Sequence, residues 1–214
     1  MFRLQDGYNY KMPVHFGGNK FDPEFVVTQR TTDLTISYET DLAQLENYIP
    51  EEFELRAPEI TVASHKYTEI NWLSGEYYNV ITVTAPVRFH GKKDQLDGDY
   101  YLVVWENRTA PIIGGREHEG VPKIYADILD LLIQRPLYGT GASCNGQTFL
   151  VMWFEATDPI SGDELDTIKA QMAYVNGLGW RYIPQLEGPG AEVSQFVIYP
   201  SVRKWRRHCK GRAA

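Results

Sequence analysis

Apolar and polar residues alternate along much of this chain with the two-residue period of half-buried β-strands. The alternation is clearest in three stretches, at residues 34–38, 60–67 and 80–89. Short runs rich in β-branched and aromatic residues, which favour strands, occur at residues 100–105, 148–154 and 193–199. The pattern therefore predicts a strand in each of these stretches.

Helical patterns are fewer and shorter. Residues 41–49 place their apolar side chains on one face, with Thr40 as the expected N-cap and Pro50 after the end. Residues 161–172 begin with acidic side chains, which suit the positive end of a helix dipole. A third short helix is expected at residues 109–113, just before a pair of glycines. Many strands and few helices predict an antiparallel, β-rich α+β domain with a few flanking helices, closed or nearly closed like a barrel.

Length and charge narrow the classes of protein that this chain can belong to. With 214 residues, no internal repeats and no low-complexity linker, we expect a single domain over residues 1–214. The formal net charge of −7 argues against nucleic acid as a partner. No apolar run reaches the roughly 18 to 20 residues that cross a bilayer, and residues 1–18 lack the apolar core of a signal peptide. We therefore expect no membrane partner.

Cysteine and histidine positions predict neither a disulfide nor a metal site. Cys144 and Cys209 lie far apart in the sequence, and two free thiols in a reducing cytoplasm are the simplest explanation. The five histidines show no metal-ligand spacing, so we expect no metal and no cofactor. One basic cluster, residues 203–212, stands out in the acidic chain. It fits a solvated final strand, an anion site, or pairing with an acidic neighbour in an oligomer.

The segment from Pro111 to Ile128 carries the most chemistry. Two glycine-containing turns lead to Lys123, which stands directly before the alternating run of residues 124–128. A lysine that enters a strand can point into a barrel, where desolvation disfavours the ammonium form and leaves a neutral amine that attacks carbonyls. A solvated lysine at a strand edge fits the spacing better, because lysine is seldom buried. Spacing alone therefore does not select the catalytic interpretation.

A family resemblance selects it. Arg116-Glu117, four intervening residues and Pro122-Lys123 resemble the segment that carries the imine-forming lysine of acetoacetate decarboxylases. Other segments resemble the family in the same order along the chain: residues 10–17, 36–41, 49–55, 86–91 and 98–100. The resemblance is good from about residue 10 to residue 130 and thin beyond. It implies a cone-like or barrel-like β fold, a homo-oligomer, and Lys123 as the catalytic residue that forms a Schiff base with a small oxo acid.

The chain also departs from the decarboxylase pattern. Ile124 stands where the decarboxylases carry a second lysine, and Ala63 falls at a position where the family carries an acidic residue. A second expected acid is replaced by Tyr78 or, in another alignment, by Asn79. A site without these carboxylates resembles the branch of the superfamily that performs aldol condensation and dehydration on oxo acids. In such a site Tyr78 would orient the substrate or shuttle a proton.

Four more polar residues are candidates for the site. Glu119 is a candidate acid/base that would replace the missing carboxylates, and a solvated turn residue fits it equally well. Arg30 lies near the place where the family carries a carboxylate-binding arginine, and Asn79 is a second candidate for substrate binding. Arg116 is a candidate for substrate binding, although we expect it mainly to pair with Glu117 and fix the turn.

The leading hypothesis is a lyase in which Lys123 condenses with a small oxo acid. Of the possible reactions, we favour aldol condensation followed by dehydration. The alternatives are an acetoacetate-type decarboxylase of a 3-oxo acid and a non-catalytic β-barrel that binds a small molecule.

Overall fold

Strands dominate the computed structural model, which describes residues 1–74, 76–204 and 209–213. The architecture confirms the predicted antiparallel, β-rich α+β class. Each of the six stretches predicted as strands lies within a strand of the structure. No helix in these ranges is long and apolar enough to span a bilayer.

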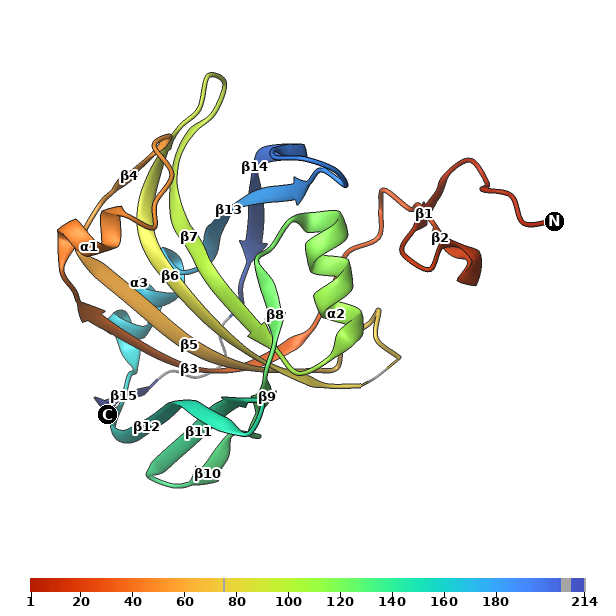
Figure 1. Cartoon of the computed structure of the whole chain (residues 1–214). Coiled ribbons are helices and arrows are strands. Elements are labelled where there is room, and N and C mark those ends of the chain that lie inside the picture. Colours follow the sequence, from red (N-terminus) through yellow and green to blue (C-terminus); the bar gives the residue numbers. More distant parts are fainter. Residues whose placement is uncertain (75, 205–208, 214) are drawn as a thin grey trace.

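The largest sheet has eight strands and curves strongly (Figure 1). Its main path runs β14-β13-β7-β6-β5-β3, with β4 beside β6 and β8 beside β7. Strands β8 and β13 pair parallel with β7, and the other pairs are antiparallel. The strands are β3 (Arg30–Glu39), β4 (Phe53–Leu55), β5 (Glu59–Thr68), β6 (Tyr78–His90), β7 (Gln95–Glu106), β8 (Lys123–Tyr125), β13 (Tyr174–Pro184) and β14 (Ala191–Val202).

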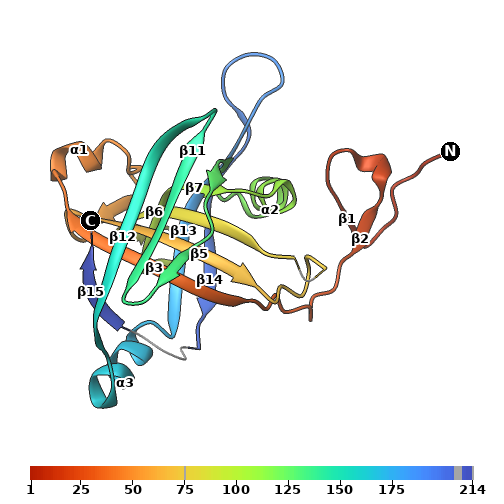
Figure 2. The ribbon, with the colours of Figure 1, turned by 90° about the horizontal axis from the view of Figure 1, so that it is seen from below.

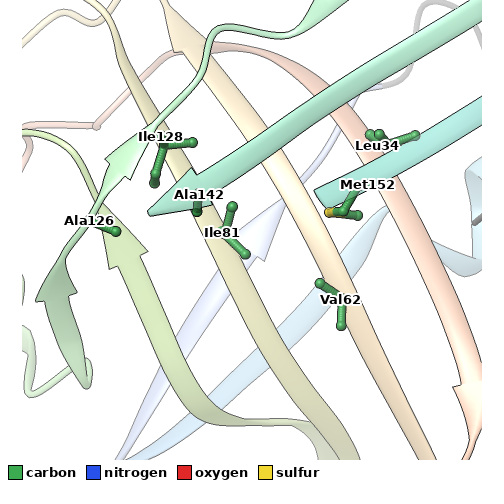
Figure 3. Close-up of a cluster of buried hydrophobic side chains, with 7 residues drawn as sticks. All are labelled: Leu34, Val62, Ile81, Ala126, Ile128, Ala142 and Met152. Carbon is green, nitrogen blue, oxygen red and sulfur yellow. The ribbon is translucent and has the colours of Figure 1, made fainter. Parts of the chain in front are cut away.

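A five-stranded sheet covers one face of the curved sheet (Figure 2). Its strands are β9 (Asp127–Ile128), β10 (Leu132–Gln134), β11 (Leu137–Cys144), β12 (Gln147–Pro159) and β15 (Cys209–Ala213). A cluster of buried apolar side chains joins the two sheets (Figure 3): Leu34, Val62, Ile81, Ala126, Ile128, Ala142 and Met152. We call the opposite face of the curved sheet the inner face.

Short helices and a hairpin complete the fold. The helices are α1 (Leu42–Glu46), α2 (Thr109–Gly114) and α3 (Gly162–Gln171), and a short 3-10 helix spans Val14–Phe16. A hairpin of β1 (Tyr8–Tyr10) and β2 (Gly18–Lys20) stands apart from the two sheets, on the side of α2 (Figure 1). All three predicted helices are confirmed, but Asp41 rather than Thr40 caps α1, because its carboxylate accepts the backbone N–H of Gln44.

The single strand expected at residues 124–128 is divided between β8 and β9, which belong to different sheets, and the fully buried Ala126 lies at the crossing. In the basic cluster, residues 205–208 lie outside the described part. Beyond them β15 pairs with β12, and Lys210 pairs with Glu164 of α3.

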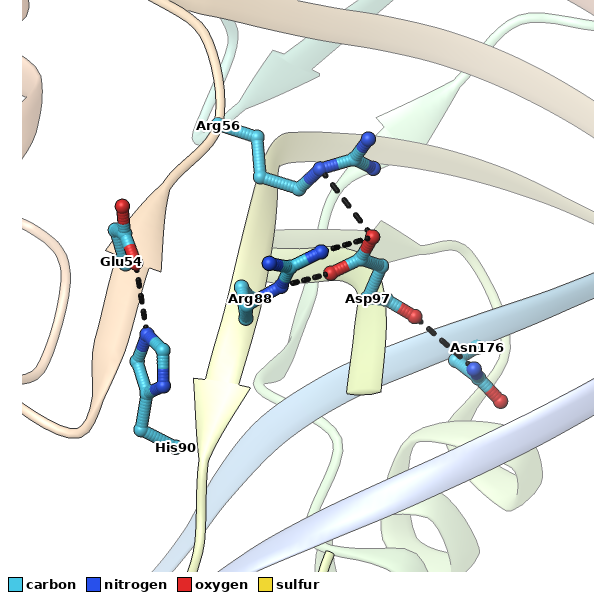
Figure 4. Close-up of polar contacts among 6 residues, drawn as sticks. All are labelled: Glu54, Arg56, Arg88, His90, Asp97 and Asn176. Carbon is cyan, nitrogen blue, oxygen red and sulfur yellow. Dashed lines mark hydrogen bonds and ion pairs between the residues drawn. The ribbon is translucent and has the colours of Figure 1, made fainter. Parts of the chain in front are cut away.

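Polar contacts tie the far ends of β6 and β7 to their neighbours (Figure 4). Arg88 donates two hydrogen bonds to Asp97, at 2.7 and 3.1 Å, and these contacts hold the pKa of Asp97 below its usual value. The side chain of Asn176 donates to the backbone carbonyl of Asp97. His90 pairs with Glu54 at 2.8 Å. These contacts fix the paired ends of β4, β6, β7 and β13.

Candidate active site

Lys123 lies at the start of β8, on the inner face of the curved sheet. In the parallel register of β7 and β8, Val104 is opposite Lys123 and Glu106 is opposite Tyr125. The Lys123 ammonium nitrogen, Nζ, lies 3.0 Å from Oε1 of Glu106. The two side chains are only 12% and 2% exposed. The strand pairing therefore creates a buried lysine–glutamate contact from residues 17 positions apart in the chain.

The preceding helix shapes the space around the lysine. Lys123 Nζ also donates a hydrogen bond of 3.2 Å to the carbonyl of Pro111 in α2. Gly115, directly after α2, lies so close that a β-carbon there would be 2.4 Å from Cδ and Cε of Lys123. The chain then forms a wide, π-helical turn at Gly115–Glu119 and returns to Lys123 through Gly120. The glycine is therefore required for the path of the lysine side chain.

The environment of Glu106 favours its neutral form. Burial raises the pKa of Glu106, the adjacent Lys123 partly offsets this effect, and the charge of Glu119 adds to it. Its second oxygen, Oε2, is buried and has no hydrogen-bond partner within the described residues. A neutral acid would be the less costly form of such a group. Glu106 is therefore suited to accept and return a proton beside Lys123.

Strand parity separates Tyr78 from Asn79. Tyr78 is buried on the inner face, and burial together with the charges of Glu106 and Glu119 raises its pKa. Asn79 points to the other face of β6, where its amide donates to Asp130 Oδ1 at 2.9 Å. The structure therefore brings Tyr78, but not Asn79, to the face that carries Lys123.

Other aromatic and polar side chains share the inner face. Tyr67 packs edge-on against Tyr78, with ring centroids 5.1 Å apart, and Tyr101 packs on the same cluster. His65 contacts Asp33 at 2.7 Å and Thr82 at 3.2 Å. Burial raises the pKa of both Tyr67 and Tyr101, so their hydroxyls remain protonated hydrogen-bond donors.

Two of the departures from the decarboxylase pattern, Ala63 and Ile124, lie on opposite faces of the curved sheet. Ala63 is buried and pairs with Thr82 across β5 and β6, so no carboxylate enters the inner face there. Ile124 pairs with Trp105, on the face opposite Lys123, and is 44% exposed. A cation at position 124 would therefore not lie beside the Lys123 amine.

Glu119 and Arg116 lie on the turn beside the lysine. Glu119 is exposed, yet its charge raises the pKa of Glu106, Tyr78 and Tyr199, so it lies within electrostatic reach of the site. Arg116 donates a hydrogen bond of 2.9 Å to the backbone carbonyl of Lys123. We expected Arg116 to pair with Glu117. Among the described residues its side chain instead donates to this carbonyl.

Arg30 is at the first position of β3, away from these contacts. Its side chain is 55% exposed and pairs with Glu69 at 2.9 Å. The structure therefore does not bring Arg30 to Lys123.

A surface hollow of about 400 Å³ occurs elsewhere, near the hairpin between β6 and β7. Its lining includes Phe53, Phe89 and Phe196, with Lys92 and Lys93 at the hairpin tip. Both of these lysines are exposed, whereas Lys123 is largely buried against Glu106. Across the ranges that the structure describes, no group of three histidine, cysteine or acidic side chains is placed to hold a metal ion.

Sequence reasoning missed Glu106, the closest partner of the lysine. The predicted strand ended at residue 105, and a glutamate directly after a strand is usually solvated. Its two-residue spacing from Val104 was the available signal, because it places both side chains on one face of an extended strand. Only the pairing of β7 with β8 shows that this face also carries Lys123.

Comparison with known proteins identifies a matching family and several structures of similar fold. The family model described as acetoacetate decarboxylase (ADC) matches residues 11–212. Acetoacetate decarboxylase from Legionella pneumophila subsp. pneumophila str. Philadelphia 1 is 18% identical, with a TM-score of 0.69 over 92% of this chain and 70% of that chain. A second acetoacetate decarboxylase is 16% identical, with a TM-score of 0.75 over 88% and 73%.

A third similar structure is the enduracididine biosynthesis enzyme MppR, complexed with the condensation product of pyruvate and imidazole 4-carboxaldehyde. It is 13% identical, with a TM-score of 0.57 over 78% of this chain and 66% of that chain. At these identities the three structures show a shared fold. Comparison with curated proteins gave no match.

Proposed function

Because the chain belongs to the acetoacetate decarboxylase family, we propose that it is a lyase that forms a Schiff base between Lys123 and the carbonyl carbon of a small oxo acid. The buried contact between Lys123 and Glu106 carries this proposal. It provides a nucleophile and a proton acceptor in contact with each other, and burial disfavours the charged form of the acceptor Glu106.

Proton transfer within this pair prepares the amine. Lysine attacks a carbonyl only as the neutral amine. The raised pKa of Glu106 allows its carboxylate to take the proton from the ammonium group. The amine then adds to the carbonyl carbon, and one amine proton moves to the oxygen to give a carbinolamine. Glu106 returns its proton to the departing hydroxyl, water leaves, and a protonated imine remains.

The protonated imine is an electron sink for the bond next to it. The Glu106 carboxylate takes a proton from the adjacent carbon, which gives an enamine. The enamine carbon adds to the carbonyl carbon of an aldehyde while the aldehyde oxygen takes up the proton. The adduct then loses water, and hydrolysis of the imine releases the product and frees the amine of Lys123. We favour this aldol condensation and dehydration because Ala63 and Tyr78 are the inner-face residues where the decarboxylases carry acids. The raised pKa of Tyr78 makes it a hydrogen-bond donor to a substrate oxygen rather than a base. The condensation product bound to MppR supports the same preference.

Decarboxylation of a 3-oxo acid is the second candidate. The same imine would accept the electron pair of a carbon–carbon bond as carbon dioxide leaves, and the resulting enamine would then be protonated. The description of the matching family supports this candidate. No cofactor is required for either reaction, because the imine itself accepts the electrons.

Borohydride trapping tests the shared first step. The protein is incubated with pyruvate and sodium borohydride, and the modified peptide is located by mass spectrometry. We expect one reduced adduct on Lys123 and none in Lys123→Ala. A wild-type protein that binds pyruvate but gives no adduct would instead support the non-catalytic binding barrel. For a protein that traps, carbon dioxide release from acetoacetate identifies the decarboxylase, and a dehydrated product from pyruvate and an aldehyde identifies the aldolase.

We also propose that the protein is a homo-oligomer. The outer face of the five-stranded sheet exposes several apolar side chains: Leu129, Leu132, Leu137, Val151 and Trp153. Exposed apolar patches of this kind often mark subunit contacts. Light scattering on a sizing column should show a mass above 24.5 kDa, and Trp153→Glu should lower that mass.

The two exposed, free cysteines support a reducing compartment such as the cytoplasm, which cell fractionation would test.

A further inference from the structure

Arg181 lies on the inner face, beside the turn that leads to Lys123. In β13 it follows Gly177 and Gly179 at two-residue intervals, so all three face the same side. A β-carbon at Gly177 would meet Tyr101 at 2.5 Å, and one at Gly179 would meet the Tyr199 hydroxyl at 2.7 Å. Arg181 therefore belongs to the same tyrosine-lined surface as Lys123.

The turn Gly115–Glu119 connects Arg181 with the lysine. Arg181 Nη2 donates a hydrogen bond of 2.7 Å to the carbonyl of Glu117. A β-carbon at Gly120 would lie 2.3 Å from Cβ of Arg181, so the arginine packs directly on this part of the chain. Gly120 is three residues before Lys123, which limits the Cα separation of Gly120 and Lys123 to about 11 Å. The Arg181 side chain begins beside Gly120, so the arginine and the lysine are both anchored next to this short stretch and can reach the two ends of a small molecule.

Two buried polar groups in this region have no hydrogen-bond partner among the described residues. Arg181 is partly buried, and it takes part in none of the ion pairs among the described residues. Its Nε is buried without an acceptor, and the Tyr199 hydroxyl on the same face is also buried without a partner. A cation and two unsatisfied polar groups together favour an anion with several acceptor oxygens.

We propose that Arg181, assisted by Tyr199, binds the carboxylate of the oxo acid whose carbonyl reacts with Lys123. The planar guanidinium matches a carboxylate, which accepts two parallel hydrogen bonds from it. This inference rests on the proposed function. It assigns to Arg181 the role that the sequence predicted for Arg30, whose charge is already paired with Glu69 on the exposed edge of the sheet. It also gives the site a basis for preferring oxo acids to neutral ketones.

Trapping with two carbonyl compounds tests the proposal. Pyruvate has both a carbonyl and a carboxylate, whereas acetone has only the carbonyl. We expect Arg181→Met to raise the half-saturating pyruvate concentration about tenfold or more, with acetone trapping changed less than about twofold. Tyr199→Phe should have the same selectivity and a smaller effect. Arg181→Lys, which keeps the charge without the planar fork, should be intermediate and provides a second variant if Arg181→Met is poorly folded.

Several outcomes would overturn it. An unchanged pyruvate response in Arg181→Met, equal losses for pyruvate and acetone, or a selective loss in Arg30→Met instead would each remove Arg181 from the role. Propionate has no carbonyl and separates this failure from failure of the Schiff base. Ligand-observed NMR should show propionate binding to the wild type and to Lys123→Met, and about tenfold weaker binding to Arg181→Met. Absence of propionate binding to the wild type contradicts the inference, whereas binding without any trapping contradicts only the proposed function.

Discussion

Lys123 and Glu106 meet across two parallel strands, with 3.0 Å between the ammonium nitrogen and one carboxylate oxygen. The lysine has its second hydrogen bond to the carbonyl of Pro111, and the glutamate has a second oxygen without a partner. This buried contact between a lysine and a glutamate is therefore the central feature of the candidate site.

Replacing Glu106 by glutamine tests its role as proton acceptor. Glutamine keeps the size of the side chain but cannot take the proton of Lys123. We expect Glu106→Gln to trap pyruvate about 100-fold more slowly than the wild type, the lower end of the usual effect of a general acid or base. The matched control is Glu54→Gln, at the far end of the sheet, where Glu54 pairs with His90. Equal trapping rates for Glu106→Gln and the wild type would contradict the role.

Two adjacent glycines offer a test of lysine placement. Gly115→Ala puts a methyl group 2.4 Å from Cδ and Cε of Lys123, so the lysine side chain must leave the path that brings it to Glu106. At Gly114 the same methyl group meets only the flexible end of Lys11, at 2.8 Å. We expect Gly115→Ala to slow trapping about tenfold or more, as misplacement of a reacting group does. Gly114→Ala should remain close to the wild type. Equal rates in the two variants would show that the path of the lysine does not depend on Gly115.

The pH dependence of stability should report the burial of Glu106. Its pKa is raised above the ordinary value of 4.5, so its protonated form stabilises the fold below that pH. This contribution is lost as the pH rises through the higher pKa of the folded state. Lys123 lowers that pKa, so in Lys123→Met the pKa should rise further. The free energy of unfolding of this variant should then fall by a larger amount as the pH rises above 4.5.

Urea unfolding at a series of pH values measures this effect. The control is Lys169→Met, which removes a lysine from the exposed pair with Asp166 on α3. Its stability curve should run parallel to that of the wild type. A parallel curve for Lys123→Met as well would show that the two residues are not coupled.

Glu119 should act through its charge. Because its charge raises the pKa of Glu106, Glu119→Gln should lower that pKa and move the limb of the pH–rate profile for trapping that reports Glu106 to lower pH. The maximal rate should stay within about threefold. A fall of about 100-fold in the maximal rate would instead make Glu119 the acid/base that the sequence predicted.

The sequence predicted the strands that alternate or are rich in β-branched and aromatic residues, and it missed strands that have neither feature. Strand β13 carries glycines at positions 177 and 179, where the close approach of Tyr101 and Tyr199 leaves no room for a side chain. Without side chains there the two-residue pattern disappears, so the strand that carries Arg181 was not predicted. The division of residues 124–128 between two sheets was missed for a related reason, because alternation reports burial on a face and not which sheet provides it.

By itself, the sequence determined the fold class and Lys123 as the candidate nucleophile. Both are local properties: strand periodicity is written along the chain, and the motif around Lys123 is contiguous. Only the tertiary structure decided which side chains surround the amine. It placed Glu106 beside Lys123, turned Asn79 to the other face, and left Arg30 on an exposed edge. These outcomes depend on strand register and strand neighbours, which are fixed by contacts between residues distant in the chain.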